Sequence, residues 1–218
     1  MAQISNASVR LKDKLHEVSG QHAEPSRIRI HRAISWLARA ECEADDPDAQ
    51  FVFLWIAFNA AYAQEFGESE STRSQLNAFF GKLLLLDEDK HLTELLFGQF
   101  TGPIRTMIGN KFVFEPFWKA LRDHDASERW QTQFNGSSKT ATRAILDGRS
   151  DIVLSVVFDR LYVLRNQIVH GGATWNSQIN REQVKDGANL LKSVIPVVID
   201  LMLDHPDIDF GEILYPVV

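Results

Sequence analysis

The sequence predicts an all-α protein, and two kinds of observation on its 218 residues support that class. Apolar residues recur at helical spacing in several segments, whereas the alternation typical of β-strands is scarce. Pro25-Ser26 and Asp46-Pro47 have the pattern of helix starts, and Gly171-Gly172 has the pattern of a helix end. Hydrophobic residues make up 44% and charged residues 24%, which is ordinary for a globular chain and excludes a wholly disordered one.

The first two long helices follow a polar N-terminal arm. Residues 1–24 are expected to form that arm, with only a short helix over 9–18. The first long helix is expected over 27–43, where apolar residues fall on one face. The second is expected over 47–66, with Asp46 as its N-cap and a proline at the first helical position. Because this second helix is apolar on nearly every side, we expect it to be the central helix of a bundle.

Residues 73–148 are expected to form an irregular helical insertion packed on the bundle, because glycines and prolines interrupt the helical pattern repeatedly. The pattern predicts short helices within it over 74–86, 88–100, 117–123 and 138–146. A separate domain is the alternative, but no composition typical of a linker marks either edge, so we assign the insertion to the same domain as the bundle.

Two further long helices complete the predicted domain, which covers residues 25–205. The helix expected over 151–170 carries a stripe of aliphatic side chains and ends at two glycines, a C-cap signal. The last helix is expected over 181–203, with a kink or a new helix start near Pro196. Residues 206–218 follow as a C-terminal tail.

Composition limits the location and the chemistry of the protein. The only cysteine is Cys42, so neither an intramolecular disulfide nor a cysteine-based zinc site can form, which suits a reducing compartment. The N-terminus lacks an apolar export signal, and the longest uncharged apolar stretch, 51–63, is too short for the ~20 residues that span a bilayer. The chain is therefore expected to be soluble and cytoplasmic. Its formal net charge of −6 argues against a general nucleic-acid coat protein but allows RNA to bind at a small local patch.

The end of the helix over 151–170 is the expected functional centre, with the sequence Arg-Asn-Gln-Ile-Val-His at 165–170. His170 could exchange a proton with the 2′-hydroxyl or the leaving 5′-oxygen of an RNA phosphodiester, because histidine titrates near neutral pH. Arg165 could neutralise the pentacoordinate phosphorane, and Asn166 could orient the histidine or donate to a phosphate oxygen. This set needs no cofactor. The seven histidines are scattered rather than paired at metal-ligand spacing, so no metal site is expected.

Helix geometry places a condition on this site. Asn166 and His170 are four residues apart and share a face, whereas Arg165 is five residues from His170 and points elsewhere on an ideal helix. The helix must therefore end or unwind near Val169 for Arg165 to reach His170. The same residue types also occur for structural reasons, because cations near a helix C-terminus satisfy exposed carbonyl groups. Spacing alone leaves the catalytic and the structural interpretations open.

The pattern Arg165-Asn166-x-x-x-His170, on a long helix of an all-α chain, resembles the signature of HEPN domains, which have an Arg, a polar residue and a His five positions after the Arg. The upstream stretch 55–62, Trp-Ile-Ala-Phe-Asn-Ala-Ala-Tyr, is similar to the Trp-x-Ala-Phe-Asn-x-x-Tyr pattern of the Apea-like branch of that family. The resemblance covers the helices at about 25–66 and 150–204.

This resemblance implies an up-and-down helical bundle and a metal-independent endoribonuclease, with Arg165, Asn166 and His170 as its catalytic residues. It implies a homodimer that brings two copies of the motif into one cleft. A role as a toxin or in phage defence follows, with an antitoxin or a nucleotidyltransferase-like protein as partner. Because other members of the family are inactive, the alternative is a non-catalytic helical module that binds RNA, a nucleotide or a protein. The intact motif favours the enzyme, and the acidic net charge favours the alternative.

Five further residues are weaker candidates for substrate binding. Asn59 is polar within an apolar helix, and a structural hydrogen bond to a neighbouring helix is the preferred explanation. Trp175 could stack on a base or close its loop over the bundle. Arg143 and Arg149, together with Lys139, could form a phosphate-binding rim or belong to a solvated helix face.

Overall fold

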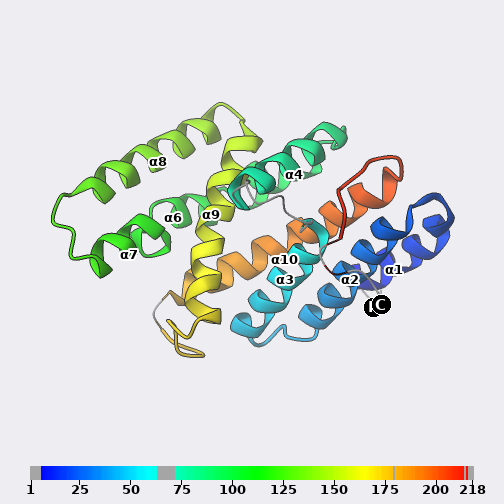
Figure 1. Cartoon of the computed structure of the whole chain (residues 1–218), viewed down its shortest axis with the longest axis horizontal. Helices are drawn as coiled ribbons and strands as arrows, with labels where there is room; N and C mark the ends of the chain where they lie inside the picture. The colour runs from blue at the N-terminus through cyan, green and yellow to red at the C-terminus, as the bar shows by residue number, and fades with distance from the viewer. Residues whose placement is uncertain (1–5, 63–71, 179, 214, 216–218) are drawn as a thin grey trace. The chain divides into compact units, whose positions relative to one another are not determined.

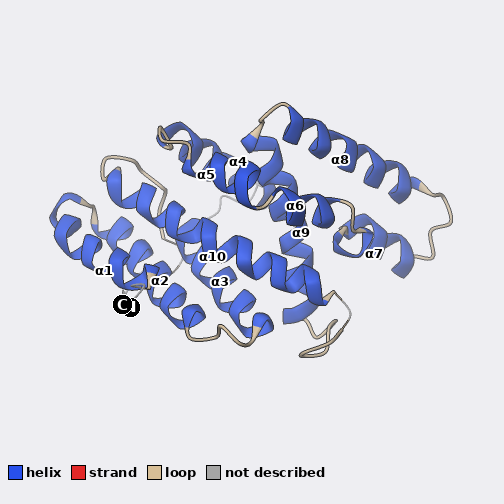
Figure 2. Ribbon diagram, turned by 180° about the vertical axis from the view of Figure 1, so that it is seen from behind, coloured by secondary structure: helices blue, strands red, loops and turns tan. Residues whose placement is uncertain are grey.

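The computed structural model describes residues 6–62, 72–178, 180–213 and 215, and these residues form helices joined by loops (Figure 2). No β-strand occurs in these ranges, which confirms the predicted all-α class. The chain divides into two compact units, which we call the first unit (Met1–Asp89 with Ala188–Val218) and the second unit (Lys90–Gly187). No helix in the described part of the chain combines the length and the apolar composition that a membrane span requires.

The first unit is a helical array in which α2 packs against both α1 and α3. Its helices are α1 (Ala7–Val18), α2 (Glu24–Glu41), α3 (Pro47–Tyr62), α4 (Thr72–Leu86) and the part of α10 (Arg181–Asp204) that begins at Ala188 (Figure 1). The Asp46 carboxylate accepts hydrogen bonds from the N–H groups of Asp48 (3.0 Å) and Ala49 (3.1 Å). This is the N-cap that the sequence predicts for α3.

Helix α3 supplies the aromatic core of the first unit. Phe58 is fully buried, and its ring centroid lies 4.8 to 6.2 Å from those of four other aromatic residues: Trp55, Tyr62, Phe79 and Phe80. Helices α3 and α4 therefore join through ring contacts, which confirms that the apolar helix is a core helix. Its predicted end near residue 66 lies outside the described residues.

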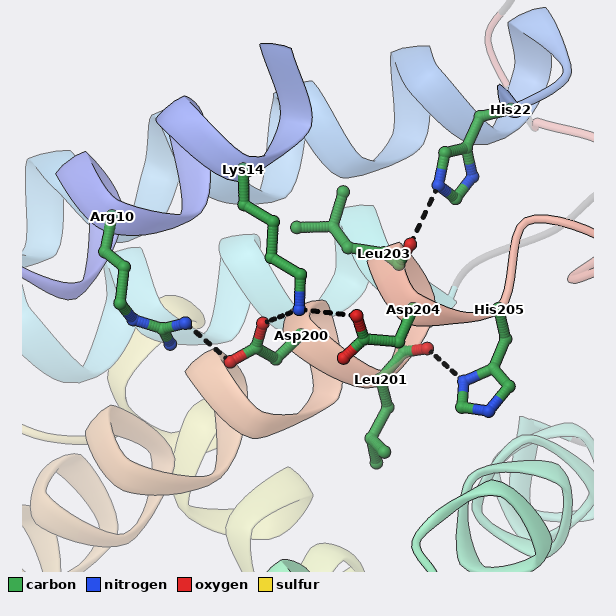
Figure 3. Close-up of polar contacts among 8 residues, drawn as sticks. All are labelled: Arg10, Lys14, His22, Asp200, Leu201, Leu203, Asp204 and His205. Atoms are coloured by element: carbon green, nitrogen blue, oxygen red, sulfur yellow. Dashed lines mark hydrogen bonds and ion pairs between the residues drawn. The ribbon is translucent and has the colours of Figure 1, made fainter. Parts of the chain in front are cut away.

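A charged cluster joins α1 to the end of α10 (Figure 3). Arg10 Nη1 is 2.7 Å from Asp200 Oδ2, while Lys14 Nζ is 2.5 Å from Asp200 Oδ1 and 2.7 Å from Asp204 Oδ1. Burial by itself would raise the pKa of Asp200, but the hydrogen bonds and charges of Lys14 and Arg10 outweigh burial and hold that pKa below its ordinary value. The two cations thus stabilise the ionised form of Asp200.

Two histidines satisfy carbonyl groups at the end of α10 (Figure 3). His22 Nε2 lies 3.1 Å from the Leu203 carbonyl oxygen, and His205 Nδ1 lies 2.8 Å from that of Leu201. The last carbonyls of a helix have no N–H partner one turn ahead, and the two rings take that place. Pro206 follows the helix end, where proline is common because it cannot continue a helix.

Replacing Asp200 with asparagine is expected to lower the free energy of unfolding at pH 7 by about 1 kcal/mol, the upper end for partly exposed ion pairs. Because the folded pKa of Asp200 is depressed, its contribution is present above the unfolded pKa of ~3.9 and is lost as pH falls through the folded pKa. Urea unfolding should show a difference between the variant and the wild type at pH 7, and the two should converge as pH falls through the folded pKa of Asp200. Asp207→Asn, an exposed site just past α10, is the control. A constant difference at all pH values would contradict the assignment.

The second unit is organised around α9, which contacts α6, α8 and the short turn η3. Its elements are α5 (His91–Glu94), the π-helical turn η2 (Leu95–Gln99), α6 (Thr101–Ile108), the 3₁₀ turn η3 (Lys111–Val113), α7 (Glu115–Arg122), α8 (Arg129–Leu146) and α9 (Ser150–Val169) (Figure 1). Arg160 of α9 is buried, with its guanidinium 4.3 Å from the centroid of the Phe114 ring and 5.5 Å from that of Phe134. This cation–π contact ties α9 to the residue between η3 and α7 and to α8 from inside the unit.

The predicted insertion differs from the observed organisation. Residues 73–148 do not form one body: α4 belongs to the first unit, whereas α5 to α8 belong with α9 to the second. The sequence pattern predicts no helix at α6, because Gly102-Pro103 is typical of a helix breaker. In the structure the proline lies in the first turn of α6, where a helix needs no N–H donor. Helix α8 begins nine residues earlier than the expected start at 138 and runs through Gly136. Helix α10 likewise continues through Pro196.

Candidate functional site

The candidate site lies at the C-terminal end of α9, in the second unit. The helix ends at Val169, and His170 is its C-cap with φ −93° and ψ 14°. Its N–H donates to the Asn166 carbonyl oxygen at 3.0 Å, and Gly171 follows with φ +72°. A residue with a side chain is strained at that positive φ, so Gly171 ends the helix as the sequence predicts. The helix therefore ends at Val169, as the geometric condition on this site requires.

The second glycine is needed for a close approach of the backbone. A Cβ atom on Gly172 would lie 3.2 Å from the Gln167 carbonyl oxygen and 3.5 Å from the Gln167 Cα. A larger residue would push the chain away from the last turn of α9. The two glycines therefore set the path of the loop that leaves the motif.

Arg165 and Asn166 form a hydrogen-bonded pair. Arg165 Nη1 donates to Asn166 Oδ1 at 2.9 Å, and both side chains are partly buried. Arg165 Nε is buried and has no hydrogen-bond partner within the described residues. An unsatisfied donor of a charged group is costly when it is buried. This guanidinium therefore has an N–H group that could donate to a further acceptor.

His170 is exposed, and its side chain makes no hydrogen bond or ion pair with any described residue. Asn166 accepts from Arg165 rather than contacting the imidazole, so the asparagine positions the arginine and not the histidine. The three motif residues therefore share one helix end, with two of them joined directly and the third free toward solvent. This arrangement places a guanidinium, a group that can bind an anion, and an exposed imidazole on one helix end.

The weaker candidates are distributed around the chain. Trp175 is 71% exposed in the loop that follows the motif. Arg143 lies 3.4 Å from Asp147, and Arg149 makes two hydrogen bonds to Asp151, at 3.0 and 2.8 Å. A phosphate would have to compete with these carboxylates. Asn59 lies on α3, in the first unit, and is half-buried.

Sequence reasoning missed the contacts that surround the motif. Gln167 Nε2 donates to the Phe112 carbonyl oxygen at 2.6 Å, and Gln167 Oε1 accepts from Asn180 Nδ2 at 3.2 Å. These bonds link the last turn of α9 to η3 and to the start of α10. The dense aromatic stretch at 112–118, Phe-Val-Phe-Glu-Pro-Phe-Trp, is the signal in the sequence that could have drawn attention to η3.

No three His, Cys, Asp or Glu side chains of the described residues gather as a set of metal ligands. Comparison with known proteins gives no match to a family model, to a curated protein or to a solved structure.

Proposed function

We propose that the protein is a metal-independent endoribonuclease of HEPN type, which cleaves RNA at a site formed across a homodimer. The observation that carries this proposal is the last turn of α9, where Arg165 is hydrogen-bonded to Asn166 and is followed one turn later by the exposed imidazole of His170. An arginine stabilises charge on phosphate oxygens, and an exposed histidine can exchange protons near neutral pH.

In the proposed reaction, one His170 takes the proton of the 2′-hydroxyl while the 2′-oxygen attacks phosphorus. The bond from phosphorus to the 5′-oxygen breaks, and the leaving oxygen receives a proton from a second His170. Arg165, positioned by Asn166, neutralises the charge that grows on the non-bridging oxygens. The products are a 2′,3′-cyclic phosphate and a 5′-hydroxyl end.

The dimer is part of the proposed mechanism, because one histidine cannot readily act as base and acid in the same step. The exposed face of α9 supports it. Tyr162, Asn166 and Val169 have the spacing i, i+4, i+7 and so share a face, and both Tyr162 and Val169 are exposed. Exposed apolar side chains on both sides of a motif residue suit contact with a second copy of the chain.

Cleavage in excess EDTA tests the proposal directly. The purified protein should cut members of a panel of single-stranded and structured RNAs and leave 5′-hydroxyl ends. Arg165→Ala should reduce the rate at least about 100-fold, and Arg165→Lys should not restore it fully, since an ammonium lacks the planar fork. Arg27→Ala, an exposed arginine of α2, is the control. No cleavage of any RNA by the wild type, or full activity in Arg165→Ala, would contradict the proposed enzyme activity.

Light scattering at micromolar concentration should give a dimer, and a monomer would contradict the shared cleft.

Cleavage of cellular or phage RNA would make the protein a toxin or a defence effector acting in the cytoplasm. Such an enzyme must be restrained, so an antitoxin or a nucleotidyltransferase-like protein is the proposed partner. A neighbouring gene for either would support this role.

A non-catalytic module that binds RNA, a nucleotide or a protein partner is the second candidate. Two observations favour it: the net charge of −6, and the lack of a hydrogen bond from the His170 side chain to Arg165 or Asn166 within the described chain. RNA binding without cleavage would select this candidate.

A further inference from the structure

Four aromatic side chains of η3, α7 and α8 form a cluster next to the candidate site, and we call it the aromatic platform: Phe112, Phe117, Trp118 and Trp130. The Phe117 ring is its centre, with centroids 5.5 Å from Phe112, 5.2 Å from Trp118 and 5.0 Å from Trp130. All three contacts are edge-on, at interplanar angles of 74° to 89°. The rings therefore support one another, as paired aromatic side chains in a core do.

Phe112 is 43% exposed, yet its backbone is held at both ends. Its N–H donates to Asn110 Oδ1 at 2.8 Å, and its carbonyl oxygen accepts from Trp118 Nε1 at 2.7 Å and from Gln167 Nε2 at 2.6 Å. An exposed apolar ring on a fixed backbone loses less entropy when a flat ligand stacks on it than a ring on a mobile loop does. This geometry suits a binding surface better than a loop whose exposed ring is free to move.

Lys111 places a positive charge against the same rings. Its Nζ lies 5.3 Å from the Phe112 centroid, 5.4 Å from that of Phe117 and 6.0 Å from that of Trp130. The lysine is exposed, so its ammonium can also meet an anion. Because the ammonium already lies over one face of these rings, the platform is not a vacant cage for an external cation. A flat ring joined to a phosphate fits both the exposed phenyl and the ammonium.

Gln167 connects the platform to the candidate site. It lies between Arg165 and His170 in the last turn of α9, and its amide donates to the carbonyl of Phe112 itself. Asn180 in turn donates to Gln167 Oε1 and holds that amide in place. A chain that stacks on Phe112 is thereby brought to the helix end that carries the proposed catalytic groups.

We propose that the aromatic platform stacks an unpaired nucleobase of the RNA, with Lys111 meeting an adjacent phosphate. This inference rests on the proposed function, and it names single bases rather than duplex as what the site engages. The chain carries a net charge of −6, so stacking rather than long-range attraction must supply most of the affinity. Paired bases inside a duplex present no free face to Phe112 and should bind weakly.

Binding of short RNAs to the non-cleaving His170→Ala protein tests the platform. The probes are a fluorescent 12-nucleotide single strand, the same sequence as a duplex, and the single strand with abasic sites. The intact single strand should bind tightest. Phe112→Ala should weaken its binding about 10-fold, and Phe112→Leu should do the same because leucine is apolar but has no π-face. Phe112→Tyr should retain affinity within about 2-fold, and Leu146→Ala, at 74% exposure in the same unit, is the control.

The outcomes separate the platform from the enzyme. The proposed platform is contradicted if Phe112→Ala binds the single strand as well as the background protein does. It is also contradicted if the duplex and the abasic strand bind as well as the intact single strand. Both conclusions hold whether or not the wild type cleaves RNA. If Phe112→Leu keeps full affinity, an apolar contact rather than base stacking is at work, and the proposal also fails. If the affinity for the single strand depends on Phe112 but the wild type cuts no RNA, the proposed platform is supported and the proposed endoribonuclease activity is contradicted. Thermal unfolding of each variant should match that of Leu146→Ala, which shows that the folds are comparable.

Discussion

Replacing His170 with alanine is expected to reduce the rate of RNA cleavage by about 100-fold or more while leaving the fold and the RNA affinity unchanged. General acid–base catalysis by one side chain contributes roughly 10²–10⁴ to a rate, and the proposed dimer loses both copies of the histidine together. The imidazole is exposed and makes no side-chain hydrogen bond with any residue that the structure describes, so its removal leaves no buried group unsatisfied.

The measurement is single-turnover cleavage, because it separates the chemical step from binding. His31→Ala is the matched control, since His31 is an exposed histidine in the middle of α2. A loss of rate in His170→Ala with unchanged affinity and melting temperature would support direct participation. Equal rates in His170→Ala and the wild type would show that the imidazole takes no part, and weakened RNA binding alone would indicate a binding role.

Replacing Phe58 with alanine is expected to destabilise the protein by about 3–5 kcal/mol. The ring is fully buried, and its centroid lies 4.8 Å from that of Tyr62 and 5.8 Å from that of Phe80, so truncation opens a cavity between α3 and α4. A typical domain has only ~5–15 kcal/mol of stability, so this loss is a large share of the whole.

Urea unfolding followed by circular dichroism measures the effect. Phe58→Leu, which leaves a smaller cavity, should lose less than the alanine variant and serves if that variant does not fold. Leu85→Ala, at an exposed site of α4, should change stability by no more than about 0.5 kcal/mol. A loss below about 1 kcal/mol in Phe58→Ala would mean that the aromatic core does not hold the first unit together.

Local features were predicted well from the sequence, since their causes lie within a few residues. The cap formed by Asp46, the stop at Gly171 and the bounds of α9 and α10 to within one residue all depend on short-range hydrogen bonds and backbone preferences. The failures have local causes as well. Gly102-Pro103 lies in the first turn of α6, where a proline removes no hydrogen bond within the helix. Gly136 lies in the interior of α8, where glycine weakens the helix only by an amount that packing can offset.

The contacts between distant segments could not be predicted in the same way. The candidate residues Arg165, Asn166 and His170 stand out in the sequence because the motif is contiguous. Phe112, whose carbonyl accepts a hydrogen bond from Gln167 within that motif, is 55 residues from Gln167 in the sequence. Which carbonyl a glutamine amide meets depends on the packing of whole helices, and no spacing rule encodes that. The division at residues 89 and 187 was missed for the same reason, because it depends on which helices bury one another's apolar faces.

The sequence by itself therefore determined the all-α class, the helix that carries the motif and the place where that helix ends. Those properties follow from apolar periodicity, capping side chains and the conformational freedom of glycine, all of which act over one or two turns. Only the tertiary structure decided that Asn166 holds Arg165 rather than His170, that Arg160 is buried against Phe114, and that a fixed, exposed phenyl ring adjoins the motif. The first depends on side-chain orientation and the other two depend on long-range packing, and both are set by the energy of the whole folded chain.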